Sequence, residues 1–142
     1  MRVLKNIRYY GETTAIAVVT FLMGLYIRFH VNYLDDPRVT PTPFLPPPDY
    51  RELLGFADDW WFATLLIIVS LVLLLGVLLD SIKLIKPTIS VLSSIYLVLA
   101  LEFSARGMLE PHFNISWAGC LIAVIAILNI MFKLGRGGDR HP

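Results

Sequence analysis

The sequence is poor in charged residues and almost free of cysteine. Of its 142 residues, 16% are charged and 56% are hydrophobic, whereas a soluble domain has about 25% charged and about 45–50% apolar residues. This composition argues against a disordered chain and against an ordinary soluble globule. The single cysteine, Cys120, excludes a disulfide within this chain and shows no metal-ligand spacing. A net charge of +1 gives no overall field to attract nucleic acid, so no nucleic-acid partner is expected.

Motifs of catalysis and cofactor binding are missing as well. The sequence contains no GxSxG, no HExxH and no P-loop. Histidine pairs can ligate haem iron, but no haem-binding pattern surrounds His30 and His112. We therefore expect a protein that is not an enzyme and that has no catalytic, cofactor-binding or metal-binding residues.

Four apolar segments are each long enough to cross a bilayer as a helix, for which about 20 apolar residues are needed. The second and fourth contain no charged residue, whereas the first contains Arg28 and the third contains Glu102 and Arg106. The predicted spans cover residues 13–33, 60–79, 88–108 and 115–132. The sequence thus predicts an all-α integral membrane protein, with a single four-helix membrane domain over residues 1–142.

The basic residues predict how the four spans are oriented, because Lys and Arg concentrate in cytoplasmic segments next to spans. Eight of the twelve lie before the first span, between the second and third, or after the fourth, and two lie in the first loop. Both termini, including the tail over residues 133–142, are therefore predicted to be cytoplasmic, in a cell inner membrane. Aromatic residues suited to the membrane interface flank the spans. These predicted anchors are Tyr33, Trp60, Trp61 and Trp117.

The outer loop between the first two spans, residues 34–59, is the longest polar segment. Its first half contains six prolines, a density typical of an extended, polyproline-like chain. In its second half, Asp49 can cap a helix and Glu52 follows three residues later, among apolar residues at helical spacing. We expect a short amphipathic helix over residues 49–59 on the outer membrane surface, in preference to a disordered polar loop.

Small and polar residues recur along three of the spans, and such residues form contacts between membrane helices. Those of the first span, from Thr13 to Arg28, fall within about 80° on a helical wheel. We therefore predict that the first, third and fourth spans pack closely together and that the second span faces more lipid. The predicted packing residues are Thr20, Gly24, Ser90, Ser94, Gly119, Ala123 and Asn129.

Three charged residues, Arg28, Glu102 and Arg106, form a predicted charge cluster inside the spans. Arg28 and Glu102 lie at similar depth in the outer third of their spans, which suggests a pair between helices. Arg106 competes for this pairing, because it lies four residues after Glu102 on the same helix. The cluster is either a proton, ion or substrate site or a structural pair. We favour the structural pair, because both groups lie near an interface instead of the midplane.

Two families of small membrane proteins share features with this plan. Small multidrug-resistance transporters are similar in size and have a membrane glutamate, but theirs lies in the first helix, where this chain has Arg28, so we reject that match. The short chain with several spans, basic cytoplasmic ends and no enzymatic motif resembles the holin-like class of phage lysis modules. This resemblance implies a protein that gathers in the inner membrane and opens lesions or regulates their opening.

These features lead us to expect a non-enzymatic protein that self-associates in the membrane in a holin-like manner. One alternative is an accessory subunit of a larger membrane complex, docked through the loop over residues 34–59. Another alternative is a small transporter that uses Glu102. The expected partners are accordingly the lipid bilayer and either further copies of this chain or another membrane protein.

Overall fold

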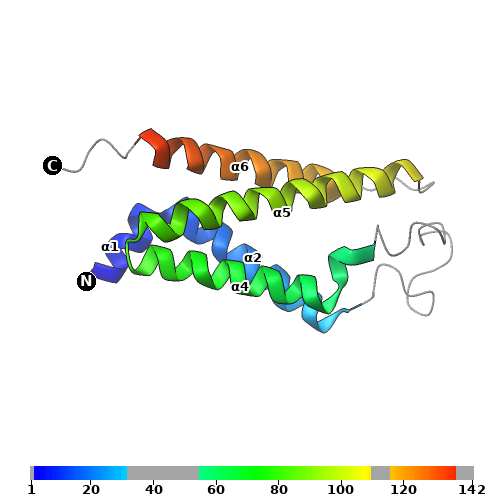
Figure 1. Ribbon diagram of the computed structural model, residues 1–142, viewed down its shortest axis with the longest axis horizontal. Coiled ribbons are helices and arrows are strands. Elements are labelled where there is room, and N and C mark those ends of the chain that lie inside the picture. The colour runs from blue at the N-terminus through cyan, green and yellow to red at the C-terminus, as the bar shows by residue number, and fades with distance from the viewer. Residues whose placement is uncertain (1, 32–54, 110–115, 137–142) are drawn as a thin grey trace.

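The computed structural model describes residues 2–31, 55–109 and 116–136 of the chain. Within these residues every regular element is helical, which confirms the all-α class (Figure 1). The elements are α1 (Arg2–Tyr9), α2 (Gly11–Phe29), the 3-10 helix η3 (Phe56–Asp58), α4 (Trp60–Leu78), α5 (Ile82–Leu109) and α6 (Ser116–Arg136).

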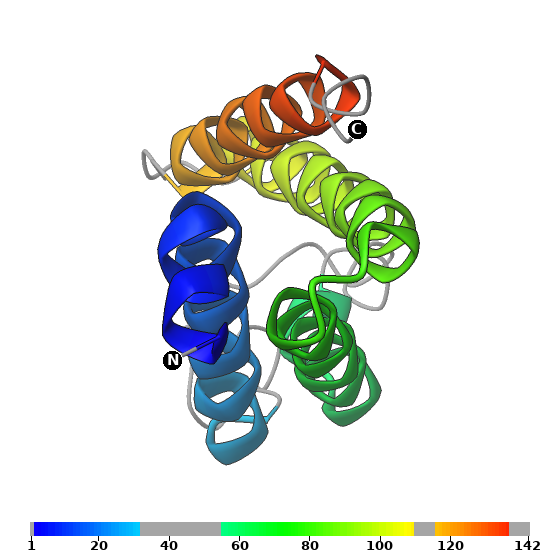
Figure 2. The same cartoon turned by 90° about the vertical axis from the view of Figure 1, so that its left-hand side faces the viewer.

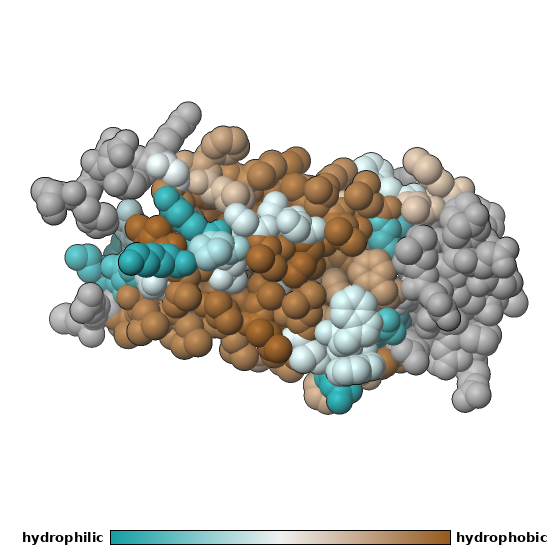
Figure 3. All heavy atoms as spheres, in the orientation of Figure 1, coloured by the Kyte–Doolittle hydropathy of each residue, from teal (hydrophilic) through white to brown (hydrophobic). Residues whose placement is uncertain are grey.

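Four of these helices, α2, α4, α5 and α6, are long and apolar enough to cross a membrane. This finding confirms the prediction of a multi-pass helical membrane protein. Figure 3 shows the same property from outside, because apolar atoms cover the middle of the face in view. The start of α2 and the end of α6 lie at the same end of the molecule (Figure 1). Which side of a membrane this end faces stays a prediction.

The third span is longer than predicted, because α5 begins at Ile82 and not after Pro87. Proline removes one backbone hydrogen bond and is best tolerated near a helix start, where the amide has no helical partner. Pro87 lies in the second turn of α5, between the buried side chains of Ile85 and Ile89. Packing of these two isoleucines keeps this turn helical, so the proline does not mark a boundary.

The spans form a bundle in which α2 packs mainly against α4, α5 packs mainly against α6, and α4 also contacts α5 (Figure 2). Contacts between α2 and α6 are few. Of the apolar window of α4, 44% is buried inside the bundle, against 17% for α6. The predicted packing of the third span on the fourth is confirmed, but the predicted close packing of the first span on these two is wrong, because α2 packs mainly against α4. The prediction that the second span faces lipid is wrong, because α4 lies between α2 and α5.

Close approach to α4 depends on glycines that face it or belong to it. A Cβ atom on Gly24 of α2 would lie 2.9 Å from Ile67 Cγ1 and 3.1 Å from the carbonyl oxygen of Ala63. Likewise, a Cβ on Gly76 of α4 would lie 3.0 Å from Ile85 Cγ1 of α5. Counting small residues in α4 alone therefore underestimated its packing, because at one contact the neighbouring helix supplies the glycine.

The connection between α4 and α5 is a tight turn that places their ends side by side. The amide of Ser81 donates to the carbonyl of Gly76 at 2.9 Å, and the amide of Asp80 donates to the carbonyl of Val77 at 3.2 Å. This is a Schellman helix end, with Asp80 in the left-handed conformation at φ 55°. Aspartate adopts this conformation more readily than bulkier residues.

The helix α1 was not predicted, and it joins α2 at a bend on Tyr10. Most of the outer loop, including residues 49–54 of the predicted surface helix, lies outside the described residues. The described end of that segment is η3, whose Ala57 and Asp58 are buried. Phe56 of η3 contacts the ring of Phe62 edge-on, with ring centres 5.3 Å apart, which attaches η3 to the start of α4.

Candidate functional site

The predicted charge cluster lies at the end of the bundle where η3 meets α4, called here the η3 end. Glu102 of α5 is buried, with 5% of its surface exposed, whereas Arg28 of α2 is exposed. No ion pair joins these two described residues, so the structure does not bring them together. Arg106 follows Glu102 by one turn of α5, and its side chain lies outside the described part.

A small apolar pocket of about 190 Å³ also lies at the η3 end, between α2, η3 and α5. A second buried carboxylate, Asp58, and the exposed His30 contribute to its wall. His30 stacks on Tyr26 with ring centres 4.2 Å apart, and its Nδ1 is 2.9 Å from the Tyr26 carbonyl oxygen. The histidine is thus held by its own helix as a polar anchor. Among the described residues, no group of three or more His, Cys, Asp or Glu could hold a metal ion.

A buried hydrogen bond between two hydroxyl groups crosses the interior of the bundle. Thr20 of α2 and Tyr96 of α5 share it, with 3.0 Å between the two hydroxyl oxygens. Both residues are buried, and Thr20 is fully so. The sequence indicated Thr20 as a packing residue but not its partner, because a tyrosine within a span reads as an apolar aromatic residue.

The predicted packing residues fall into two groups in the structure. Thr20 and Gly24 lie inside the bundle, and Ala123 is partly buried against the core. The others are exposed on α5 and α6, where nothing lies within 4 Å of a Cβ placed on Gly119. These exposed residues are Ser90, Ser94, Gly119 and Asn129.

The outward face of α6 combines apolar side chains with one amide. Ile122, Ile125 and Phe132 are 66–69% exposed, and the exposed Asn129 lies among them. Within the described part of the chain, the Asn129 side chain makes no hydrogen bond. Ser94 of α5 differs, because its hydroxyl donates to the Ser90 carbonyl of its own helix at 3.2 Å.

At the opposite end, called the α1 end, two polar side chains attach the N-terminal segment to α4. The Asn6 amide donates to the Leu78 carbonyl at 3.2 Å, and the Tyr10 hydroxyl donates to Asp80 Oδ1 at 2.9 Å. Burial and then the hydrogen bond to Asp80 raise the pKa of Tyr10 from its ordinary value of 10.0 to about 12. These contacts join segments that are far apart in sequence, and the sequence carried no signal for them.

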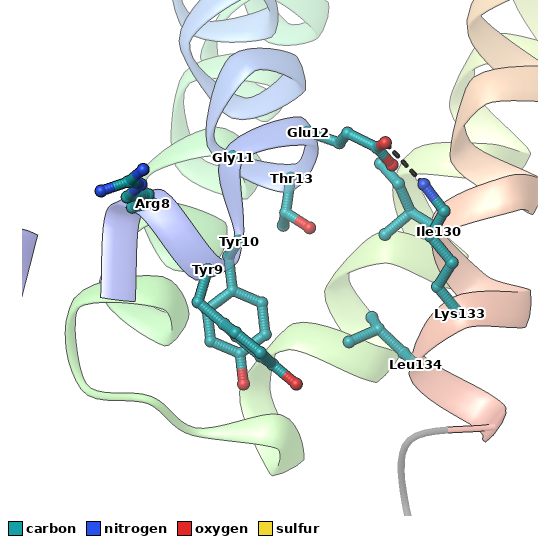
Figure 4. Close-up of a pocket in the computed structure, with 9 residues that line it drawn as sticks. All are labelled: Arg8, Tyr9, Tyr10, Gly11, Glu12, Thr13, Ile130, Lys133 and Leu134. Atoms are coloured by element: carbon teal, nitrogen blue, oxygen red, sulfur yellow. Dashed lines mark hydrogen bonds and ion pairs between the residues drawn. The ribbon is translucent and has the colours of Figure 1, made fainter. Parts of the chain in front are cut away.

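An ion pair and a pocket also lie at the α1 end, between the start of α2 and the end of α6 (Figure 4). Lys133 Nζ lies 2.6 Å from Glu12 Oε1, and both side chains are more than half exposed. The pocket beside this pair has a volume of about 380 Å³. Sequence reasoning missed it, although an acidic residue in the first turn of a helix, such as Glu12, is a recognised signal.

The predicted interface anchors are described only in part. Trp60 and Trp61 begin α4 and are 62% and 45% exposed, and the indole nitrogen of Trp61 donates to Asp59 Oδ2 at 2.8 Å. Trp117 near the start of α6 is half-buried, and Tyr33 lies outside the described residues. The exposed tryptophans therefore offer an apolar ring and a polar edge at one helix end, as interfacial residues do.

The described residues thus provide two buried carboxylates, one buried hydroxyl pair, an exposed amide on α6 and an ion pair beside a pocket. Comparison with known proteins adds no assignment to these features: no family model, no curated protein and no solved structure matches this chain.

Proposed function

We propose that this protein is a non-enzymatic integral membrane protein that self-associates in an inner membrane through the outward face of α6. Association would bring copies of α6 together and would open or regulate a holin-like lesion, with both termini in the cytoplasm. Asn129 is the observation that carries the proposal.

Asn129 is a polar side chain at a depth where lipid offers no hydrogen-bond partner. The apolar window of α6 runs from Trp117 to Gly135, so Asn129 lies about 4.5 Å along the axis from its midpoint at Ala126. A polar group in hydrocarbon without a partner is unfavourable. Because the described chain gives Asn129 no hydrogen bond, a neighbouring helix is the natural source of one.

The exposed residues around Asn129 have the spacing of a helix–helix seam. Ile122, Ile125, Asn129 and Phe132 follow one another at steps of three, four and three, and all are exposed. This is the apolar spacing of a heptad repeat, in which one asparagine defines register and the number of helices. Two copies of α6 would place the same residues on both sides, so Asn129 could bond its equivalent.

The association step is tested by comparing Asn129→Leu with Ser94→Ala. The first variant removes the exposed amide, whereas the second removes a hydroxyl that its own helix already satisfies. We expect Asn129→Leu to lower the association constant about 3- to 30-fold, as loss of one hydrogen bond between membrane helices implies, and Ser94→Ala to leave it unchanged. Energy transfer between labelled copies in vesicles, measured against protein-to-lipid ratio, gives the constant. Equal association of both variants would contradict the seam.

The lesion step is tested separately by following membrane potential after induced expression. The proposal predicts a collapse of the potential that depends on expression level and that Asn129→Leu delays. Normal growth with an intact potential at high expression would exclude the holin-like activity while leaving self-association standing.

Purification in mild detergent separates self-association from membership in a fixed complex. The proposal predicts that the tagged chain recovers only untagged copies of itself. Recovery of a different membrane protein in constant ratio would instead favour an accessory subunit.

A further inference from the structure

The pocket at the α1 end takes no part in the proposed association and has a chemistry of its own. It lies between the first turn of α2, the end of α1 and the last turns of α6 (Figure 4). Its volume of about 380 Å³ is enough for a small polar group. The described lining residues that matter here are Arg8, Thr13, Glu12, Ile130, Lys133 and Leu134.

The N-terminus of α2 supplies backbone donors to this pocket. The first backbone hydrogen bond described at the start of α2 is donated by the Thr14 amide to the Tyr10 carbonyl at 2.8 Å. The amides of residues 11–13 precede it and have no carbonyl within their own helix to bond. They also carry the positive end of the dipole of a 19-residue helix. Such a helix start favours an anion.

Thr13 gives an independent indication of a ligand. Its side chain is 3% exposed, and within the described part of the chain its hydroxyl makes no hydrogen bond. The next residue, Thr14, instead donates to the Tyr10 carbonyl of the preceding turn at 3.0 Å. Figure 4 shows the Thr13 hydroxyl directed into the space between α2 and α6. Its oxygen is not among the fully buried unpartnered atoms of the described residues, so it stays accessible from the pocket and can donate to an acceptor there.

Two basic residues at the pocket can attract an anion, and one acidic residue, Glu12, competes with it for Lys133. The positive charges belong to Lys133 and Arg8. Lys133 is paired with Glu12, with 2.6 Å between Nζ and Oε1. Both partners of this pair are more than half exposed, so the pair is readily exchanged for another. Ile130 and Leu134 form an apolar side next to these charges.

The depth of the pocket in a membrane would bring it to lipid headgroups. Gly11 is the first residue of the apolar window of α2, and Lys133 lies two residues before the end of that of α6. The site is thus at the edge of the apolar belt, where phosphate groups of phospholipids lie next to their chains.

We propose that this pocket binds a phosphate group, presented by a phospholipid headgroup or as free phosphate. The amides of residues 11–13 and the Thr13 hydroxyl donate to its oxygens, and Lys133 turns from Glu12 to the phosphate. Phosphate is the anion that helix N-termini and lysine bind together in proteins.

The decisive test compares two variants that break the same ion pair. Glu12→Gln and Lys133→Gln each remove the ion pair between α2 and α6. If the pocket binds phosphate, Lys133→Gln weakens binding about tenfold by removing a charged donor. Glu12→Gln tightens it several-fold, because the competing carboxylate is gone. If both variants weaken binding equally, the pair acts only on structure and the proposal is overturned.

Thr13 provides a second pair of variants of nearly unchanged shape. Thr13→Val removes the hydroxyl and is expected to weaken binding about tenfold, whereas Thr13→Ser keeps the hydroxyl and restores binding to within about twofold of the original. Circular dichroism of each variant checks that the helices are intact. Equal affinities of Thr13→Val and the parent chain would exclude the hydroxyl as a ligand.

Three probes distinguish the source of the phosphate. The full chain in dodecyl maltoside is titrated with inorganic phosphate, with a short-chain phosphatidylglycerol and with diacylglycerol of the same chain length, and its thermal unfolding is followed. Saturable stabilisation by phosphatidylglycerol alone assigns a lipid headgroup, and equal stabilisation by inorganic phosphate assigns a free anion. Saturable binding of diacylglycerol, or no saturable response to any probe, would overturn the proposal.

Discussion

The helices α4 and α6 are both apolar, yet they differ in how much of their surface is buried in the bundle. Their candidate membrane spans have the same length of 19 residues, and both have high mean hydropathy. Nevertheless, α4 is 44% buried between α2 and α5, whereas α6 is 17% buried and contacts mainly α5. Hydropathy therefore says that both helices belong in a membrane, but not which one faces protein.

The difference lies in what the neighbouring helices offer. Helix α4 meets Gly24 of α2 at backbone distance and brings its own Gly76 to α5. A Cβ atom placed on Gly119 of α6 would have nothing within 4 Å, and the Asn129 side chain makes no hydrogen bond within the described chain. In a membrane, packing between helices depends on close backbone approach and hydrogen bonds, because lipid is as apolar as the side chains. The same kinds of residue therefore pack inside the bundle on α2 and α4 but are exposed on α6, where we propose that a second copy contacts them.

Substituting the two glycines should separate the two sides most strongly. Gly24→Leu places a side chain against the backbone of Ala63 and Ile67, which cannot move aside, and is expected to destabilise the monomer by about 3 kcal/mol. Gly119→Leu fills open space and should not lower monomer stability. Unfolding of both variants in detergent, followed by circular dichroism, measures the difference. Equal stabilities would show that α2 and α4 are not in close contact.

A substitution at Glu102 tests whether this buried carboxyl group at the η3 end stabilises the bundle. Glu102→Gln keeps the shape but replaces the carboxyl group of a side chain that is 5% exposed with an amide. We expect lower abundance in the membrane and a loss of about 2 kcal/mol in stability, since weakening a buried polar contact is costly. Arg28→Gln, at an exposed position, should change little. Normal abundance of Glu102→Gln with loss of one specific transport activity would support the transporter alternative instead.

The sequence predicted the elements of this fold better than their arrangement. An apolar run such as that from Trp60 to Leu78 is a local property, so the four long helices could be found directly. The helix α1 was missed, because its eight residues are too short to span a membrane and were read as a basic flank. The third span was predicted to begin at residue 88, whereas α5 begins at Ile82, since the burial of Ile85 and Ile89 in the bundle cannot be read locally.

Site residues were predictable as types but not as pairs. Thr20, Gly24 and Asn129 could be identified as small or polar residues within apolar spans. Thr20 and Gly24 lie inside the bundle, and Asn129 is exposed on α6. Their partners could not be found, because Thr20 meets Tyr96 across 76 residues and Glu12 meets Lys133 across 121. Without a second copy of the chain in view, no local pattern distinguishes a face turned to lipid from one turned to a partner.

The hydrogen bond between Thr20 and Tyr96 should contribute less than the glycine contact but still favour the α4 side of the bundle. Tyr96→Phe removes one hydroxyl from a buried pair and is expected to lower stability by about 1 kcal/mol. Thr20→Val should have a similar effect, and the double variant should cost less than the sum because one bond is lost only once. Fully additive effects would mean that the two hydroxyls do not interact.

The hydrogen bond from Tyr10 to Asp80 should give the smallest effect and a distinct pH dependence. The folded pKa of Tyr10, about 12, lies above its ordinary value of 10.0, so the folded state favours the protonated hydroxyl. Its contribution, about 0.5–1 kcal/mol for one part-buried hydrogen bond to a carboxylate that solvent partly screens, is complete below pH 10 and is lost as the pH rises from 10 towards 12. Tyr10→Phe should therefore be less stable than the parent chain at pH 8, with a difference in unfolding free energy that narrows above pH 10.

Tyr9→Phe, at a position that is 76% exposed, is the matched control and should be as stable as the parent chain at pH 8. If the stability difference of Tyr10→Phe stays constant from pH 8 to 11, the effect comes from packing of α1 on the α4–α5 turn and not from the hydrogen bond to Asp80. The glycine contacts would then be the main reason that α4, unlike α6, is enclosed.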